Sequence, residues 1–401
     1  MRAGTTLRSG TPEQAGMSSR RIQHVRDLAA GWVEDGMHPA LVIFAARRGV
    51  IVLNEAFGKL TPEPDSPPLQ LDSIFPLASM TKPITATAVM LLVEDGLLGL
   101  NRPVQDYIPE FEGEGKSDVM VHHLLTHTSG LIDPDPSQDE IDDFWWWPTK
   151  ADEQTEIPLF GDEPHPFVQH KLLQSCRAPM VAKPGSVMAY CNSGYGLLGE
   201  IVQRVSGVPL ANFTEKRIFQ PLGMRDTHFI TPFNTDHRSR VVRRSSNNPF
   251  AALDDPEMMD IPAAPGGVHS TATDMAVFGQ MFLNSGTYDD ERILNRSTVR
   301  EMTRNQIPGV GSEFRGEHHD EAPWGYGWGV HGGVPWASYP GALMSPETFH
   351  HGGAGGVHLW IDPTYELVGV YFSVAVEMAS ETVSRYAADL FASAITAAVD
   401  D

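Results

Sequence analysis

The stretch Phe75-Pro76-Leu77-Ala78-Ser79-Met80-Thr81-Lys82-Pro83 carries a serine three residues before a lysine. The residues that follow are apolar at helical spacing, so we expect Ser79 and Lys82 to lie at the start of a helix. Positions i and i+3 of a helix share a face, which brings the hydroxyl within reach of the amine. A desolvated lysine can accept the proton of a serine and make it a nucleophile. A capping serine beside a solvated lysine is the alternative, and the other parts of the chain decide between the two.

The composition is that of a folded globular chain with an acidic surface. Of the 401 residues, 41% are hydrophobic and 20% are charged, and the formal net charge is −22. This excess of carboxylates argues against nucleic acid or an anionic membrane as a partner. Two cysteines, Cys176 and Cys191, are too few for a disulfide framework. The first ten residues hold no apolar signal-peptide core, and no run of about 18 apolar residues occurs, so we expect a cytoplasmic protein without a membrane span.

Hydrophobic spacing predicts strands at both ends of the chain and helices between them. Apolar runs at 40–46 and 50–53, split by Arg47-Arg48-Gly49, indicate a β-hairpin. Two further runs at 356–361 and 367–372 indicate late strands. Helices are expected at 18–35, 79–96, 119–125, 193–206, 209–219, 273–283, 297–302 and 380–398, and polar loops at 58–72, 132–166 and 231–262.

Hairpins at both ends favour an α+β fold, in which one antiparallel β-sheet is flanked by terminal helices and closed by both ends of the chain. We expect the mostly helical middle to be a large insertion. The predicted subdomains are 1–78 plus 262–401 and 79–261, with the active site in the cleft between them. Trp145, Trp146 and Trp147 lie in the long loop 132–166. They either wall an apolar substrate pocket or form a satellite core.

Two further motifs supply the remaining parts of an acylation site. Tyr190-Cys191-Asn192 places a tyrosine, which can shuttle a proton when cations lie nearby, beside an amide that can bind the substrate and Lys82. His350-His351-Gly352-Gly353-Ala354-Gly355-Gly356 opens the late strand, and its glycines allow close approach of the backbone. Backbone N–H groups on such a strand edge can bind an oxyanion.

The order S-x-x-K, then Y-x-N, then a basic residue with glycine on a late strand resembles the serine β-lactamase and penicillin-binding-protein superfamily. The resemblance is strongest to class C β-lactamases and family VIII carboxylesterases. It covers about residues 15–395. The supporting segments are Leu124-Leu125-Thr126-His127-Thr128-Ser129-Gly130-Leu131, Pro184-Gly185-Ser186, Gln220-Pro221-Leu222-Gly223-Met224 and Gly267-Val268-His269-Ser270-Thr271-Ala272-Thr273-Asp274.

The resemblance implies a role for each matching residue. Ser79 would be the acylated nucleophile and Lys82 the lysine that activates it. Tyr190 would exchange protons with the serine, the leaving group and water. The backbone N–H groups of Ser79 and Ala354 would form the oxyanion hole. Neither a cofactor nor a metal is implied.

The implied substrate-binding residues are Asn192, His351, Gly352 and Gly353, with His351-Gly352-Gly353 in the place of K-T-G. Class C β-lactamases carry lysine where this chain has His351, which is only partly charged near neutrality. We therefore expect a carboxylesterase whose partner is a small-molecule ester, with the oligomeric state left open. The alternatives are an acyltransferase, a β-lactamase or D-amino-acid peptidase, and a non-catalytic binding module.

Three other patterns receive structural interpretations. Gly194-Tyr195-Gly196-Leu197-Leu198-Gly199 matches a dinucleotide-binding fingerprint, but no strand precedes it, so we interpret its glycines as helix packing. His127 is expected to anchor its loop by hydrogen bonds. Glu317-His318-His319-Asp320 lacks the spacing of a helical metal motif.

Overall fold

The computed structural model describes residues 5–133, 165–232, 236–246, 248, 251–255, 259–314, 317–333, 341–374 and 380–401. Trp145, Trp146 and Trp147 lie outside these residues, so their predicted place beside the substrate stays a prediction. Within the described part of the chain, no helix is long and apolar enough to cross a membrane.

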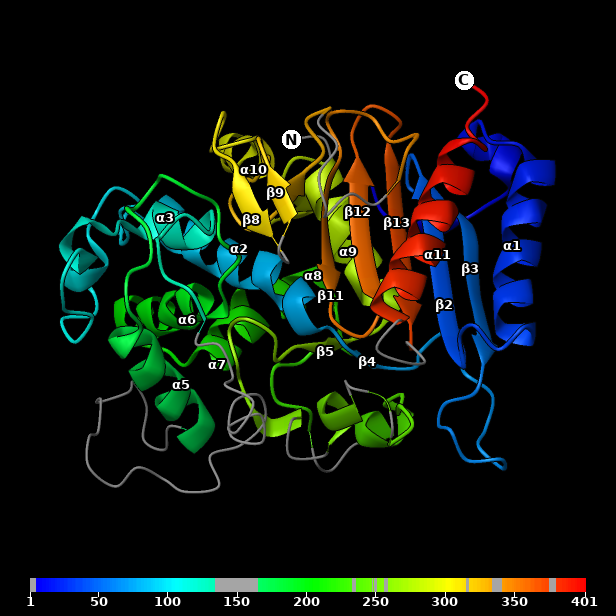
Figure 1. Cartoon of the computed structure of the whole chain (residues 1–401). Coiled ribbons are helices and arrows are strands. Elements are labelled where there is room, and N and C mark those ends of the chain that lie inside the picture. Colours follow the sequence, from blue (N-terminus) through cyan, green and yellow to red (C-terminus); the bar gives the residue numbers. More distant parts are fainter. Residues whose placement is uncertain are drawn as a thin grey trace.

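A seven-stranded sheet forms the centre of the described structure (Figure 1). Its order is β1-β3-β2-β13-β12-β11-β10, and every pair is antiparallel except β1 with β3. The strands are β1 (Arg8–Ser9), β2 (Ala40–Arg47), β3 (Val50–Gly58), β10 (Gly329–Val330), β11 (Phe349–Gly353), β12 (Val357–Asp362) and β13 (Leu367–Ser373). β2 pairs with β13, so the early and late hairpins join in one sheet as predicted.

Side chains along each strand alternate between the two faces of the sheet. Helices cover both faces. From β2, Leu41 and Ile43 pack with the helices α1 (Ser19–Glu34) and α11 (Ser380–Thr396) on one face. Val42 and Phe44 belong to the core on the other face, where α9 (Ala272–Leu283) lies. Figure 1 shows α1 and α11 together on the outer face. The predicted α+β class with terminal helices on an antiparallel sheet is confirmed.

The middle of the chain is mostly helical and surrounds α2 (Thr81–Glu94). Twelve consecutive residues of α2, from Thr81 to Leu92, are buried, as expected of a helix enclosed on all sides. The other helices are α3 (Val121–Leu125), α5 (Pro166–Arg177), α6 (Asn192–Ser206), α7 (Leu210–Thr214), α8 (Gln220–Leu222) and α10 (Arg296–Thr303), with a π-helical turn at Glu215–Phe219. Short ladders pair β4 (Phe75–Pro76) with β5 (His269–Ser270), β6 (Thr287–Tyr288) with β7 (Glu291–Arg292), and β8 (Ser312–Phe314) with β9 (Glu317–His319).

Two features differ from the sequence-based expectation. The segment 350–356 does not open the strand 356–361. It forms most of a separate strand, β11, and then a turn into β12, because the glycines at 355 and 356 adopt positive φ and reverse the chain. The sequence pattern also does not predict the helix α5, because its start at Pro166 follows a long polar segment with no helical spacing. The predicted subdomain boundaries, 1–78 plus 262–401 and 79–261, stay a prediction.

The glycines of the apparent dinucleotide fingerprint lie inside α6, and the predicted role in helix packing is confirmed for Gly199. A Cβ atom at Gly199 would overlap the Cβ of Ala264. At Gly194 the nearest atoms belong to Leu124, on α3. α6 therefore passes close to Ala264 because Gly199 has no side chain, whereas a Cβ atom at Gly194 would make an ordinary contact.

We expect Gly199→Ala to lower the free energy of unfolding by about 1–3 kcal/mol, because the added methyl overpacks the contact with Ala264. Gly196→Ala on the same helix is the matched control. Its nearest neighbour outside the helix is Ser175 Oγ at 3.7 Å, so the methyl fits and should raise stability by about 0.5–1 kcal/mol. Chemical denaturation measures both, and shifts of the same sign would contradict this packing.

Candidate active site

Ser79 is presented by a short backbone segment that is held on both sides. β4 pairs with β5, the N–H of Leu77 donates to the carbonyl of Val268 at 2.8 Å, and Ser79 follows in the 3₁₀ turn Ala78–Met80. Ala78 has a φ of +45°, a left-handed conformation that costs a non-glycine residue about 1 kcal/mol or more. Such a backbone persists only where its surroundings enforce it, and here it turns the half-buried Ser79 into position before α2 begins.

The amine of Lys82 is buried and lies against three oxygen atoms. Nζ is 3.1 Å from Ser79 Oγ, 2.8 Å from Asn192 Oδ1 and 3.0 Å from the carbonyl oxygen of Pro265. A neutral amine has two N–H bonds and one lone pair. The two carbonyl oxygens can only accept, so they take the two N–H groups. The lone pair is then left facing the hydroxyl of Ser79, which can donate to it.

Burial makes this neutral form accessible near pH 7. The loss of hydration lowers the pKa of Lys82 to about 7, and the negative charge of Asp133 partly opposes this effect. The Nζ atom also lies 4.7 Å from the centroid of the Tyr190 ring. Ser79, Lys82, Asn192 and Tyr190, which the sequence motifs named, are thus brought together.

His127 holds Tyr190 in place. The two rings stack with centroids 4.3 Å apart, and Nδ1 of His127 accepts a hydrogen bond from the backbone N–H of Cys191 at 3.1 Å. Burial and the nearby Lys82 hold the pKa of His127 well below its usual range, so the ring is neutral. The predicted anchoring role of His127 is confirmed. Burial also raises the pKa of the Cys191 thiol, which argues against a thiolate nucleophile there.

β11 lies directly against the segment that presents Ser79. A Cβ atom at Gly353 would overlap the carbonyl oxygen of Leu77, so only glycine permits the contact. β10 pairs with Phe349 and His350 alone, and Gly352, Gly353 and the half-buried Ala354 lie beyond that pairing. The contact of Gly353 with Leu77 brings the end of β11 close to the segment that carries Ser79. The substrate-binding roles of Gly352 and Gly353 and the oxyanion hole of Ser79 and Ala354 stay predictions.

His351 is neutral and presents an acceptor. Its Nδ1 lies 2.7 Å from the carbonyl oxygen of Gly352, so Nδ1 carries the proton and donates it. Burial and the neighbouring Lys82 hold the pKa of His351 well below its usual range. The other nitrogen, Nε2, then has a lone pair, and it is buried without a hydrogen-bond partner among the described residues. The ring lies near Tyr190, with centroids 6.3 Å apart.

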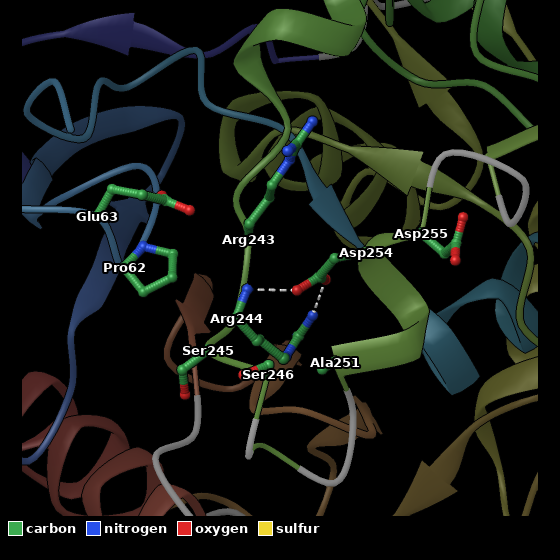
Figure 2. Close-up of a pocket in the computed structure, with 9 residues that line it drawn as sticks. All are labelled: Pro62, Glu63, Arg243, Arg244, Ser245, Ser246, Ala251, Asp254 and Asp255. Carbon is green, nitrogen blue, oxygen red and sulfur yellow. Dashed lines mark hydrogen bonds and ion pairs between the residues drawn. The ribbon is translucent and has the colours of Figure 1, made fainter.

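Arg244 packs behind the turn that follows β11. Its guanidinium is buried, forms an ion pair with Asp254, and occupies the space that a Cβ atom of Gly355 would need. A cavity of about 510 Å³ adjoins it (Figure 2). The residues that line this cavity are Pro62, Glu63, Arg243, Arg244, Ser245, Ser246, Ala251, Asp254 and Asp255.

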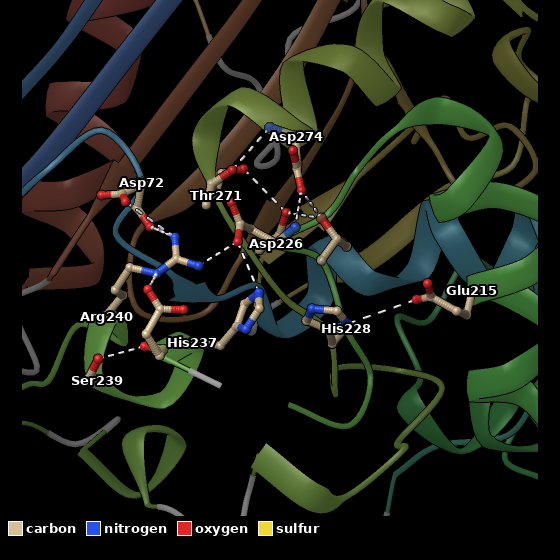
Figure 3. Close-up of polar contacts among 12 residues, drawn as sticks. Asp72, Glu215, Asp226, His228, His237, Ser239, Arg240, Thr271 and Asp274 are labelled. Atoms are coloured by element: carbon tan, nitrogen blue, oxygen red, sulfur yellow. Dashed lines mark hydrogen bonds and ion pairs between the residues drawn. The ribbon is translucent and has the colours of Figure 1, made fainter. Parts of the chain in front are cut away.

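A second polar network fixes the chain segment that leads into β4 (Figure 3). Asp226 accepts a hydrogen bond from Arg240 at 2.5 Å and lies 3.0 Å from Nε2 of His237, and its own N–H donates to Asp274 at 2.9 Å. Arg240 also donates to the carbonyl of Asp72 at 2.8 Å, shortly before the strand that carries the chain to Ser79. The network therefore holds the backbone at Asp72, a few residues before β4 and Ser79.

Two residues of the site do not belong to any of the sequence motifs. Pro265 contributes only a backbone carbonyl, which no side-chain pattern reveals. Asp133 accepts hydrogen bonds from the backbone and side chain of Asn192. In the sequence it is one acidic residue in a polar loop, and its partner lies 59 residues further along. Within the described ranges, no group of three His, Cys, Asp or Glu side chains is placed to hold a metal ion.

Comparisons with known proteins identify the family of this chain. The Beta-lactamase family model matches residues 25–393. Protein Rv1367c of Mycobacterium tuberculosis is 30% identical over 332 residues, which cover 76% of this chain and 78% of that protein.

Two solved structures share the fold. A penicillin-binding protein homologue from Caulobacter crescentus has a TM-score of 0.72 at 21% identity, covering 96% of this chain and 99% of its own. A family VIII carboxylesterase has a TM-score of 0.69 at 22% identity, covering 93% of this chain and 98% of its own.

The chain therefore belongs to the Beta-lactamase family. Members of this family are typically serine hydrolases, and the superfamily predicted from the sequence motifs is confirmed.

The pKa of Lys82 predicts the pH dependence of Ser79. Below pH 7 the amine is protonated and has no lone pair for the hydroxyl, so labelling of Ser79 by a neutral fluorophosphonate should fall about tenfold per pH unit. Above pH 7 the rate should level off. Mass spectrometry of the labelled peptide across pH 5–9 measures this profile, and Lys82→Arg, which stays protonated, should remain slow throughout. A profile without a midpoint near pH 7 would contradict the assignment.

Proposed function

We propose that this chain is a carboxylesterase that cleaves neutral esters through an acyl-enzyme on Ser79. The observation that carries the proposal is the hydrogen bonding of Lys82. Two carbonyl oxygens, from Asn192 and Pro265, occupy its N–H groups and leave its lone pair for the serine hydroxyl 3.1 Å away. A base in contact with a hydroxyl, with its pKa lowered to about 7 by burial, is what activates a serine nucleophile.

In the acylation step, Ser79 Oγ attacks the ester carbonyl carbon while its proton passes to Lys82 Nζ. The carbonyl oxygen becomes an oxyanion, which the N–H groups of Ser79 and Ala354 bind. The C–O bond to the alcohol then breaks. Tyr190 donates a proton to the departing alkoxide and regains one from Lys82, so that the alcohol leaves neutral and the acyl group remains on Ser79.

Deacylation reverses these transfers with water in place of the alcohol. Tyr190 passes its phenolic proton to Lys82 while it takes a proton from the attacking water, and the same two N–H groups bind the second oxyanion. Collapse of this intermediate breaks the bond to Ser79 Oγ, which recovers its proton from Lys82. The carboxylic acid then leaves. An alcohol or amine that replaces the water would give acyl transfer by the same steps.

His351 supports a neutral ester as the substrate. β-Lactam antibiotics and D-amino-acid peptides end in a carboxylate, and a cation is the group that binds a carboxylate most strongly. Burial keeps His351 uncharged, and its Nε2 lone pair would repel a carboxylate oxygen.

We expect Ser79→Ala to reduce hydrolysis of p-nitrophenyl butyrate by more than about 1,000-fold, because no other group forms the acyl-enzyme. Mass spectrometry of the wild type should show a butyryl adduct on Ser79. Ser117→Ala, at an exposed serine, is the control and should leave the rate unchanged. Full activity in Ser79→Ala would refute the mechanism, and absence of turnover for any ester would refute the carboxylesterase.

His351→Lys should shift the preference towards substrates that carry a carboxylate. A charge-assisted hydrogen bond contributes about 1.5–3 kcal/mol, so kcat/KM for nitrocefin should rise about 10- to 100-fold relative to p-nitrophenyl butyrate. His351→Gln keeps the site uncharged and should leave this ratio near that of the wild type. If nitrocefin is turned over as fast as the ester before any substitution, charge at position 351 does not set the specificity.

A further inference from the structure

The side chain of Asp133 forms hydrogen bonds with the start of α6. Its carboxylate accepts hydrogen bonds from the backbone N–H groups of Asn192 and Ser193, both at 2.8 Å, and from Asn192 Nδ2 at 2.9 Å. The first N–H groups of a helix have no partner within the helix, and an N-cap side chain usually accepts from them. The N-cap of α6 is Cys191, which makes no such bond. A carboxylate distant in the sequence therefore caps the helix.

This cap fixes the orientation of one amide. Because Asn192 Nδ2 donates to Asp133, the atom that faces Lys82 is Oδ1, 2.8 Å from Nζ. An oxygen at this place takes an N–H of the amine. A flipped amide would present its own N–H groups and would compete with Ser79 for the lone pair. The side chain of Asp133 thus determines which way the lone pair of Lys82 points.

We infer that Asp133 is a positioning residue for the nucleophile, acting on Ser79 through the amide of Asn192 and the amine of Lys82. The inference rests on the proposed function and extends it to a residue that none of the sequence motifs contains. Asp133 itself bonds to the start of α6 and is not a catalytic residue.

The carboxylate also acts on Lys82 through its charge. A negative group nearby favours the protonated amine, so its removal should shift deprotonation of Lys82 to lower pH. Other titratable groups surround the pair and must be kept constant in a test. Those facing Lys82 or Asp133 are His127, Lys171, Tyr190, Cys191, Tyr195 and His351.

The experiment must separate the orientation of Asn192 from the capping of α6. Asp133→Asn removes the charge at constant size, and it weakens the cap. Cys191→Ser places a hydroxyl at the N-cap, where serine accepts from helix N–H groups, and so restores a cap without holding the Asn192 amide. We compare the double variant with Cys191→Ser alone, and Asp118→Asn, at an exposed carboxylate, controls for loss of charge. Melting temperature and the pH profiles of kcat and KM with p-nitrophenyl butyrate are measured.

The difference in melting temperature between the double variant and Cys191→Ser should be smaller than the difference between Asp133→Asn and Cys191→Ser. The kcat of the double variant should nevertheless remain about 10- to 100-fold below that of Cys191→Ser, with KM unchanged, because the lone pair of Lys82 is no longer directed at Ser79. The midpoint of the acid limb should move about one pH unit lower. Recovery of kcat and of the original midpoint in the double variant would show that Asp133 only caps the helix, and the inference would fail.

Two readouts keep this inference separate from the proposed function. Labelling of wild-type Ser79 by a fluorophosphonate reports on the nucleophile alone. NMR titration of the Lys82 amine in the double variant reports on Asp133 without turnover. If the wild type is labelled at Ser79 and Asp133→Asn leaves the titration of Lys82 unchanged, the role of Asp133 is overturned. The proposed nucleophile then remains in place.

Discussion

The buried amine of Lys82 is the constraint on which the rest of the site depends. A charged ammonium without exposed surface loses its hydration, and this loss is tolerated only where acceptors lie close and the neutral form is within reach. The acceptors come from three places in the chain: Ser79 one turn away, Asn192 at the start of α6, and the carbonyl of Pro265 before β5. The helical middle and the sheet must therefore assemble around α2 before the amine can act as a base.

Two neutral histidines complete the surroundings of this amine in opposite ways. His127 uses its Nδ1 lone pair to hold the backbone of Cys191, so its proton is on Nε2. His351 uses its Nδ1 proton to hold the carbonyl of Gly352, so its lone pair is on Nε2. Both rings are kept uncharged by burial and by the same lysine. A second positive charge is thereby avoided beside Lys82, and position 351 holds a hydrogen-bond acceptor instead of a cation.

The sequence motifs predicted the parts of the site that lie within single turns or on one strand. Ser79 and Lys82 share a helical turn, and short continuous apolar runs predicted the strands that meet at the centre of the sheet. The contribution of Pro265 could not be predicted, since a carbonyl belongs to every residue. Asp133 bonds to a helix start 59 residues away, and such a contact depends on the tertiary fold rather than on a local pattern. Very short strands such as β4 are set by their pairing partners and carry no periodicity of their own.

One requirement of the proposed mechanism bears on the backbone around Ser79. In the proposed oxyanion hole, the N–H groups of Ser79 and Ala354 converge on one oxygen atom, and this requires the segment before α2 and the end of β11 to touch without side chains between them. This explains why Gly353, whose Cβ would overlap the carbonyl of Leu77, admits no larger residue. It also explains the left-handed Ala78, whose φ of +45° turns the next N–H away from the ordinary helical direction. The cost of that conformation is offset by the β4–β5 ladder before it and the buried α2 after it, so the strained residue lies between a paired strand and a buried helix.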